Sequence, residues 1–545
     1  MNRFDWHNPY PTPRLPVFAR NVVSTSHPLA AQAGLRALWQ GGNAVDAAIA
    51  AAAALTVVEP VSCGLGGDAF ALVWDGAKLH GLNASGVAPA AWSVDYFKQR
   101  YGEARGLAIQ PKRGWDTATV PGVVAGWEAL HAKFGSLPFG DLMAGAIDIA
   151  ERGHAVASIV AKKWAAAIPE LEGLPGFAAT FMPSGRAPLV SELVRLPGHA
   201  RTLRLLAAQG PRAFYEGEPA ERIAAFARDG GGAMTERDLR DYRPMWVEPI
   251  GKDYRGYTVH EIPPNGQGIA ALIALGILER FNLRDLPRDG IDSQHLQIEA
   301  MKLAFADVYR YVADPRAMDV TPEQMLDDSY LAARAALIDL KRATHFAFGM
   351  PKAGGTIYLT AADERGMMVS FIQSNYMGFG SGIVVPGMGI ALQNRGCGFS
   401  MDPRSPNVVA GGKRPFHTII PAFVTERVDG RQQPVMSFGV MGGDMQPQGH
   451  LQSIVRMLDY GQQPQAACDA PRWKVNRDFT LDIESTFDRG VAQALQARGH
   501  VIKAIDDPYM DFGSGQYIWK LSHEEPERGY VAASDTRRDG LAAGF

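Results

Sequence analysis

The chain has 545 residues, of which 46% are apolar and 20% are charged, and its formal net charge is -3 at pH 7. This length exceeds what one simple core usually organises, so two large lobes or one large layered domain are expected. The near-neutral charge argues against a nucleic-acid-binding protein, which needs a clustered basic surface.

The cysteines and the apolar runs bear on the cellular location. Cys63, Cys397 and Cys468 form a sparse, odd set that is typical of a reducing compartment and predicts no disulfide framework. The first residues, MNRFDWH, lack the apolar segment of a secretory signal. The longest apolar run, residues 47–58, is too short to cross a bilayer as a helix and predicts a buried core helix. We therefore expect a cytoplasmic protein that does not bind membranes.

The predicted elements change in character along the chain. An irregular arm over residues 1–25 precedes an Ala-rich helix near 28–40 and the buried helix. A strand over 69–74 and a helical middle follow, with strong helical periodicity over 295–311. After residue 351, short β-type runs separated by Gly and Asn or Asp dominate, interrupted by one helix near 448–460. This order predicts layered sheets covered by helices, with a seam near residue 350.

The glycine-rich sequence GLGGDA (residues 64–69) matches a dinucleotide-binding pattern. That pattern needs a strand before it and a helix after it, whereas here a helix precedes and a strand follows. Glycines that permit close packing are the favoured interpretation, and no cofactor is predicted.

Metal and cysteine chemistry have weak signals. The sequence contains no His-Glu-x-x-His and no Cys-x-x-Cys pattern. His295 and Glu299 are one helical turn apart but lack further ligands nearby in sequence, so a capped or core-facing pair is favoured and no metal is predicted. Cys397 is a possible nucleophile for which the sequence indicates no partner.

The sequence GGTIYLT (residues 354–360) carries the strongest chemical signal. Thr356 stands between two glycines and a β-type run, and a second β-type run follows a turn near residue 364. A Thr that becomes N-terminal after cleavage has a nucleophilic hydroxyl and a free α-amine that serves as its base. Gly355 suits such a cut because it has no Cβ. On these residues alone, a hairpin with an ordinary strand Thr remains the simpler interpretation.

A second glycine-rich sequence, GVMGGD (residues 439–444), follows a predicted strand and leads into a helix. Glycine amides at a helix N-terminus can stabilise an oxyanion. Beside a Thr nucleophile, they would supply the electrophilic half of an acyl-transfer site.

These residues resemble the γ-glutamyltransferase family of self-processing N-terminal-nucleophile hydrolases, over nearly the whole chain. The matching motifs, in family order, are GGNAVDAA (41–48), VEP (58–60), VPG (120–122), EAMKLAFAD (299–307), FGSG (379–382), KRP (413–415) and SD (534–535). The resemblance implies an α+β fold, a four-layer αββα sandwich. It also implies self-cleavage between Gly355 and Thr356 into a large subunit, 1–355, and a small one, 356–545, that stay together as a heterodimer and possibly dimerise again.

The resemblance also assigns site residues. Thr356 takes the place of the nucleophile, and Ser374 that of the Thr that hydrogen-bonds the nucleophile. Gly442 and Gly443 take the place of the oxyanion-hole glycines. No cofactor or metal is implied.

The pocket departs from the family pattern at several positions. Ser85, upstream of the Ala-Pro-Ala at 88–90, stands where the family has an Arg for the substrate α-carboxylate. An Asn-Gln-x-x-Asp-Phe pattern that holds the α-amine becomes NRGCGF (394–399), so Asn394 is kept but Arg395 and Gly398 replace the Gln and the acid. The remaining pocket positions carry His417 and Thr418 in place of two serines, and Tyr376 in place of an Asn.

These departures indicate the γ-glutamyltransferase-like amidohydrolase branch. Without an acid at Gly398 nothing obvious pairs an ammonium group, whereas Arg395 suits a carboxylate bidentately. The main hypothesis is a Thr-nucleophile hydrolase of a small carboxylate-bearing amide. Two alternatives stay open: a true γ-glutamyltransferase or glutathione hydrolase, and an unprocessed non-catalytic scaffold.

Overall fold

The computed structural model describes residues 14–346, 355–505 and 512–545, and for residues 355–357 it describes the backbone only. Helix α1 (Pro28–Trp39) and helix α2 (Ala44–Val58) lie close to the boundaries expected from the sequence. Asn43 and Asp46 cap α2 reciprocally: Asn43 Oδ1 accepts from the N–H of Asp46 at 3.0 Å, and Asp46 Oδ2 accepts from the N–H of Asn43 at 2.9 Å. Every residue of α2 is buried, which confirms the predicted core helix.

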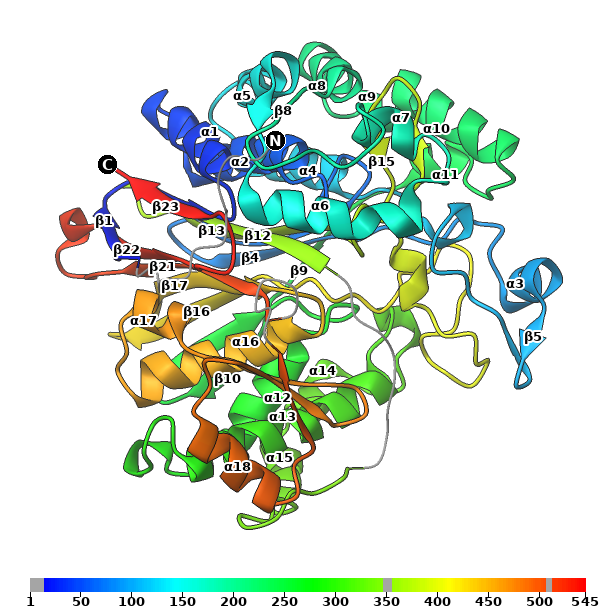
Figure 1. Cartoon of the computed structure of the whole chain (residues 1–545). Helices are drawn as coiled ribbons and strands as arrows, with labels where there is room; N and C mark the ends of the chain where they lie inside the picture. Colours follow the sequence, from blue (N-terminus) through cyan, green and yellow to red (C-terminus); the bar gives the residue numbers. More distant parts are fainter. Residues whose placement is uncertain (1–13, 347–354, 506–511) are drawn as a thin grey trace.

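Two seven-stranded antiparallel sheets form the centre of the molecule (Figure 1). The first sheet has the order β1 (Val17–Ala19), β22 (Tyr530–Ser534), β21 (Ser514–Lys520), β17 (Arg431–Met441), β16 (Ala422–Val428), β11 (Tyr257–Glu261), β10 (Ile250–Tyr254). The second has the order β23 (Leu541–Gly544), β2 (Val22–Thr25), β12 (Gly355–Ala362), β13 (Met368–Tyr376), β3 (Asp68–Trp74), β4 (Leu79–Ala84), β9 (Met245–Val247). Both sheets therefore combine strands from before and after residue 350, so the seam in composition does not separate two lobes.

The N-terminal arm was expected to be irregular up to residue 25, and the structure corrects this. Residues 17–19 and 22–25 form β1 and β2, which pair with β22 and β23 near the C-terminus. These strands are short and their partners lie more than 500 residues away in sequence, so local patterning could not reveal them.

The two sheets face each other across a layer of buried side chains. The hydroxyls of Thr360 in β12 and Ser437 in β17 lie 2.6 Å apart across this layer. Around them pack apolar side chains from both sheets, such as Phe70, Ile372 and Phe423. This packing fixes β12 directly against β17.

Helices cover the outer face of each sheet, above and below in Figure 1. On the second sheet lie α1 and α2 with α4 (Val123–Phe134), α5 (Phe139–Arg152), α6 (Ser158–Leu171), α7 (Phe177–Phe181), α8 (Pro197–Gln209), α9 (Ala213–Glu216), α10 (Glu218–Asp229) and α11 (Glu236–Asp241). On the first sheet lie α12 (Ile269–Leu278), α13 (Ile291–Tyr311), α14 (Pro322–Met325), α15 (Asp328–Ala335), α16 (Met445–Ile454), α17 (Pro464–Asp469) and α18 (Arg489–Ala497). The predicted helices near 295–311 and 448–460 correspond to α13 and to α16 with the π-helical turn Val455–Asp459.

Smaller elements decorate this body. Helix α3 (Val94–Tyr101) projects at one side with the short pair β5 (Glu103–Ala104) and β6 (Leu107–Ala108), and the remaining pairs are β7 (His154–Ala155) with β8 (Leu193–Val194) and β14 (Val384–Val385) with β15 (Ile390–Ala391). A three-stranded sheet contains β18 (Trp473–Val475), β19 (Leu481–Glu484) and β20 (Ile502–Ile505).

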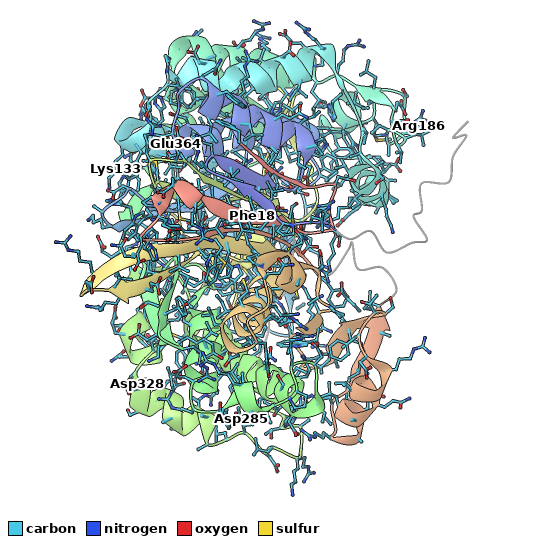
Figure 2. The ribbon with its side chains drawn as sticks, turned by 90° about the vertical axis from the view of Figure 1, so that its left-hand side faces the viewer. Phe18, Lys133, Arg186, Asp285, Asp328 and Glu364 are labelled. Carbon is cyan, nitrogen blue, oxygen red and sulfur yellow. The ribbon has the colours of Figure 1, made fainter. Side chains whose placement is uncertain are left out.

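The outer helical layers carry their charge on the surface. Figure 2 shows Lys133 and Arg186 on the helical part at the top, and Asp285 and Asp328 on the part at the bottom. Among the helices of the described ranges, none is both long enough and apolar enough to cross a membrane.

Candidate active site

The predicted nucleophile lies at the start of a central strand. Gly355 and Thr356 are the first two residues of β12, which runs between β2 and β13 as the predicted hairpin requires. Gly355 pairs with Tyr376 and Ile357 with Gln373, so the register shifts across Thr356. A β-bulge changes the direction in which a side chain points, and bulges are common beside active sites. The side chain of Thr356 lies outside the described atoms.

Ser374 and Tyr376 lie on the neighbouring strand β13, beside this bulge. Both are buried, and Ser374 Oγ accepts a hydrogen bond from the N–H of Tyr376 at 2.8 Å. Tyr376 has a φ of 77°, a left-handed backbone that a bulky residue rarely adopts. Strained residues of this kind cluster at functional sites.

The glycine turn at residues 442–443 connects β17 to α16. Its carbonyls are engaged: Gly442 O accepts from Met445 N, and Gly443 O accepts from Gln446 N and from Gln267 Nε2 at 2.9 Å. Within the described ranges, the N–H groups of the two glycines donate no hydrogen bond. The two amide N–H groups of the turn therefore have no acceptor among the described residues, which is compatible with the predicted oxyanion role.

Strand register relates this turn to the predicted nucleophile. Thr360 faces Ser437 across the two sheets, and two residues further along each strand, Tyr358 lies against Gly439. Two residues further along these strands are Thr356 in β12 and Met441 in β17, and Met441 is the residue before the glycine turn.

Arg395 is the most unusual side chain of the candidate site. It is only 1% exposed. Its Nη1 donates to Thr418 Oγ1 at 2.7 Å, and its guanidinium carbon lies 4.5 Å from the centre of the Tyr376 ring. Its Nε and Nη2, which share one edge of the guanidinium, have no hydrogen-bond partner among the described residues. Burial lowers the pKa of Arg395 to about 10, and the nearby Asp68 opposes this shift.

Asp68 is a site residue that the sequence reasoning missed. Its Oδ2 lies 3.0 Å from His417 Nε2, and its Oδ1 accepts from the N–H of Gly86 at 3.0 Å. Burial raises the pKa of Asp68 to about 7, while Arg395 and backbone N–H groups oppose the rise. The available signal was an acid as the first residue of an otherwise apolar strand.

His417 is held by Asp68 from one side and by backbone from the other. Its Nδ1 accepts from the N–H of Ile419 at 3.3 Å, so this network assigns the hydrogen to Nε2, which donates to Asp68. Burial and the charge of Arg395 lower the pKa of His417 well below its usual value. His417 is therefore a neutral donor beside Arg395.

Ser85 and Asn394 lie in networks at the edge of this cluster. Ser85 Oγ donates to Asn83 Oδ1 at 2.7 Å and accepts from Asn265 Nδ2 at 3.2 Å, and Asn265 O accepts from the N–H of His417 at 2.9 Å. Asn394 Oδ1 accepts from the N–H of Met377 at 3.1 Å. The structure thus brings Tyr376 and Thr418 into contact with Arg395, and His417 lies next to Thr418 in the chain. Ser85 is connected to His417 through Asn265.

The GLGG sequence forms no dinucleotide loop. Gly66 bridges to Leu392, and a Cβ on Gly66 would lie 2.3 Å from Ala391 O. The close-packing interpretation is confirmed, and the loop supports the chain that leads to Arg395.

Cys397 lacks the features of a reactive thiol. Burial raises its pKa to about 12, and its Sγ lies 3.5 Å from the carbonyl oxygens of Pro111 and Lys112. A protonated thiol that donates to carbonyls is a poor nucleophile.

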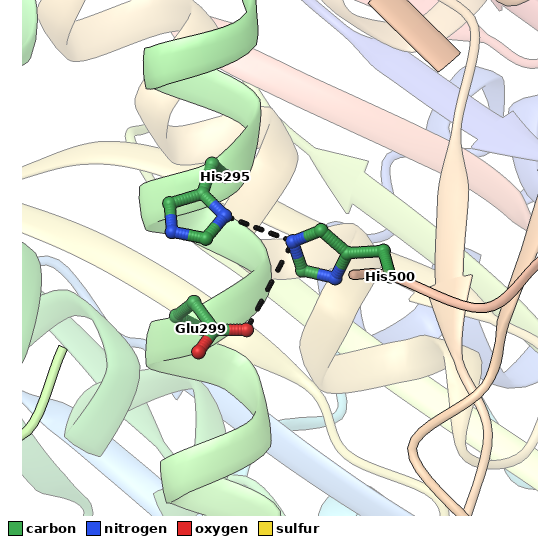
Figure 3. Close-up of side chains that lie close together, drawn as sticks. All are labelled: His295, Glu299 and His500. Atoms are coloured by element: carbon green, nitrogen blue, oxygen red, sulfur yellow. Dashed lines mark hydrogen bonds and ion pairs between the residues drawn. The ribbon is translucent and has the colours of Figure 1, made fainter. Parts of the chain in front are cut away.

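The structure adds His500 to the pair His295 and Glu299, a set of residue types that often binds metals (Figure 3). Lys302 Nζ, however, donates to Glu299 Oε1 at 2.7 Å and to His500 Nδ1 at 3.4 Å. An ammonium group at this position repels a metal cation.

Hydrogen bonds occupy the imidazole nitrogens of this cluster. His295 Nε2 donates to Asp339 O at 2.8 Å, and His500 Nε2 then donates to His295 Nδ1 at 2.8 Å. Glu299 Oε2 accepts from the N–H of Thr344 at 2.9 Å. A metal does not fit these residues, which instead join α13 to His500 and to the chain just before residue 347.

Comparison with known proteins shows which family the chain resembles. The family model described as gamma-glutamyltranspeptidase matches residues 30–545. A glutathione hydrolase-like YwrD proenzyme of Bacillus subtilis (strain 168) is 35% identical over 535 residues, 96% of this chain and 98% of that protein. An oxamate amidohydrolase proenzyme of Klebsiella pneumoniae is 36% identical over 543 residues, 97% of this chain and 99% of that protein.

A solved structure is similarly close. The crystal structure of a cephalosporin acylase from Bacillus halodurans has a TM-score of 0.93 at 48% identity, covering 100% of this chain and 99% of that one. These matches confirm the resemblance inferred from the sequence motifs. The chain belongs to the gamma-glutamyltranspeptidase family.

Proposed function

We propose that this protein is a self-processing amide hydrolase that uses Thr356 as its nucleophile and acts on a small amide bearing a carboxylate. The observation that carries the substrate class is the buried edge of Arg395, whose Nε and Nη2 have no partner within the part of the chain that the structure describes. Two parallel N–H donors on one edge match the two oxygens of a carboxylate.

The proposed chemistry starts with cleavage of the Gly355–Thr356 bond, which gives the pieces 1–355 and 356–545. The freed α-amine of Thr356 takes the hydroxyl proton as Oγ attacks the substrate amide carbonyl. The N–H groups of Gly442 and Gly443 hold the oxyanion, and the proton passes to the leaving amine. Water then attacks the resulting ester, releasing a carboxylic acid and restoring Thr356.

The surroundings of Arg395 support a carboxylate over an ammonium group. Thr418 and the Tyr376 ring fix the guanidinium from two sides, which leaves its Nε–Nη2 edge as the available donor pair. At Gly398, where the family has an acid, a Cβ would lie 2.5 Å from Phe416 O. A counter-charge for an ammonium group therefore does not fit at that position without a backbone shift.

Access to Arg395 depends on processing in this proposal. The residue is 1% exposed in the continuous chain, so a substrate reaches its open edge only after a rearrangement. We assign this opening to cleavage before Thr356. Thr356 lies on β12, next to β13, and β13 carries the Tyr376 ring that covers Arg395.

The two pieces would remain together, because β12 of the second piece lies between β2 and β13 in a sheet that both pieces share. We interpret the two sheets and their helical coats as the four-layer αββα sandwich of N-terminal-nucleophile hydrolases. Further dimerisation and a cytoplasmic location belong to the same proposal; the three cysteines are all free thiols, as a reducing compartment requires.

The names of two relatives agree with this substrate class. One is an oxamate amidohydrolase proenzyme and another is a cephalosporin acylase. Oxamate is itself a small amide that carries a carboxylate. We therefore place substrates of this chemistry ahead of γ-glutamyl compounds.

Three anilides test the proposal on the processed protein. Glutaryl-p-nitroanilide carries the carboxylate, 5-oxohexanoyl-p-nitroanilide replaces it with a neutral group of similar shape, and γ-glutamyl-p-nitroanilide adds an ammonium group. We expect the glutaryl compound to have the highest kcat/KM. In Arg395→Met, its kcat/KM should fall roughly 10- to 100-fold, the effect of a charged hydrogen bond, while the neutral compound is unaffected.

Two results would overturn this assignment. Equal losses on the charged and neutral anilides in Arg395→Met would mean that Arg395 only supports the fold. Fastest turnover of the γ-glutamyl compound, with transfer to a dipeptide, would favour the γ-glutamyltransferase alternative, and absence of cleavage in the wild type would favour the scaffold.

A further inference from the structure

A buried ion pair lies directly beside the glycine turn, and no residue of it has been assigned a role so far. Asp444 follows Gly443 at the N-terminal boundary of α16 and is 4% exposed. Its carboxylate caps no N–H group of that helix, although the position suits such a cap. The carboxylate is instead bound by Arg477.

Arg477 binds this carboxylate through two nitrogens. Its Nη2 donates to Asp444 Oδ1 at 2.9 Å, and its Nε donates to the other oxygen, Oδ2. Arg477 lies in the turn between β18 and β19 of the small sheet, where the N–H of Phe479 donates to Asn476 O. A separate structural unit thus brings a positive charge to the residue after the glycine turn.

We propose that Arg477 and Asp444 are positioning residues for the oxyanion turn, in which Arg477 cancels a negative charge that would oppose the oxyanion. The inference rests on the proposed role of Gly442 and Gly443. Neither side chain of the pair needs to touch the substrate. The pair fixes the conformation of the turn and keeps its electrostatic potential favourable for developing negative charge.

The charge argument follows from distance and burial. Asp444 is adjacent in sequence to Gly443, whose N–H would receive the oxyanion. Two negative charges this close, in surroundings that exclude water, repel each other by enough to slow the reaction roughly 10- to 100-fold. With Arg477 bound bidentately, the pair is neutral overall.

Four groups face Asp444 and set its ionisation. Arg477 and Lys474 come from the small sheet, Tyr309 from α13 and Tyr376 from β13. Arg477 also lies over the Tyr309 ring, 5.2 Å from its centre. Because burial raises the pKa of Asp444 while Arg477 and Lys474 lower it, removing Arg477 favours the protonated acid.

A double-mutant cycle tests the inference on the processed protein with glutaryl-p-nitroanilide. We expect Arg477→Met to lower kcat roughly 10- to 100-fold with KM changed less than about twofold. Asp444→Asn, which removes the charge and keeps one acceptor, should lower kcat by about threefold. The double variant should match Asp444→Asn, because no charge is then left to cancel.

The pH profile supplies a readout that a purely structural role would not move. In Arg477→Met, the kcat deficit relative to the wild type should shrink as the pH falls and Asp444 becomes protonated. Arg204→Met is the matched control: Arg204 binds Glu151 through the same two nitrogens on the exposed faces of α8 and α5. Its kcat should equal that of the wild type.

Each outcome decides the inference. Equal losses in Arg477→Met and in the double variant, at every pH, would reduce the pair to a structural role, and a change in KM alone would make Arg477 a substrate ligand. If the wild type cleaves none of the anilides, the proposed substrate class fails. The same mutant cycle is then measured on the burst of p-nitrophenol that p-nitrophenyl acetate releases during acylation. Thr356→Ala serves as the blank. In that assay, the ranking of the variants by burst rate supports or overturns the proposed role of the Arg477–Asp444 pair, whatever the natural substrate is.

Discussion

Thr356 is the second residue of β12 and follows two glycines in the sequence, and the proposed chemistry needs its hydroxyl twice, once to cut the chain and once to attack the substrate. We predict that Thr356→Ala gives one uncut chain of 58.9 kDa without hydrolase activity. Thr356→Ser should still cut itself, because a hydroxyl remains. Denaturing electrophoresis with intact mass and N-terminal sequencing checks both variants.

The matched control for this substitution lies in the same strand. Thr360→Ser keeps the hydroxyl that contacts Val369 O and Ser437, far from the chain break. This variant should process like the wild type. Fragments that begin at residue 356 in Thr356→Ala would rule out the nucleophile assigned here.

At the scale of elements, the glycine loop before β3 supports the segment that carries Arg395. A Cβ on Gly66 would lie 2.3 Å from Ala391 O. Because this oxygen belongs to the backbone, it can move only if the chain segment that continues to Arg395 moves with it. We predict that Gly66→Ala lowers the free energy of unfolding by about 1–3 kcal/mol and impairs turnover. Urea titration and the anilide assay measure the two effects.

Gly173 provides the comparison for this prediction. Its backbone does not need a positive φ, and a Cβ there would meet nothing within 4 Å. Gly173→Ala should leave both quantities within error of the wild type. An equally stable Gly66→Ala would show that the loop adapts and does not constrain the site.

At the scale of the whole molecule, His500 joins the C-terminal part of the chain to α13 and, through His295, to Asp339. Burial, and the charge of Lys302, lower the pKa of His500 to about 3, below its usual value of 6.5. The folded chain therefore keeps His500 neutral while the unfolded chain protonates it below pH 6.5. The stability that this histidine contributes is complete above pH 6.5 and is lost as the pH falls from there toward 3.

This sign gives a prediction for His500→Gln in the uncut Thr356→Ala chain, which avoids dissociation of two pieces. The substitution should destabilise the protein at pH 7.5, because the buried hydrogen-bond chain is broken. The destabilisation should shrink by about 2 kcal/mol at pH 5, since the wild type then bears the cost of excluding a proton. Urea unfolding at both pH values checks this, and a pH-independent difference would contradict the assigned protonation.

Local chemistry in the sequence determined many elements and indicated several candidate site residues. The apolar run over residues 47–58 predicted α2, a turn between two β-type runs predicted the β12–β13 hairpin, and glycines marked the turn before α16. Together with the motifs, they indicated the family and the candidate residues Thr356 and Arg395. Propensity, capping and turn chemistry act over a few residues, which is why they can be recognised without the fold.

Only the tertiary structure decided the strand order and the surroundings of the pocket. No local pattern indicated that β1 and β2 pair with strands near the C-terminus, or that Asp68 contacts His417 across 349 positions. The sequence could not indicate which guanidinium nitrogens of Arg395 lack a partner among the described residues. That depends on Thr418 and the Tyr376 ring, which contact the guanidinium from different parts of the chain. Such contacts depend on how distant elements pack, and packing is set by the sum of many weak interactions rather than by any local pattern.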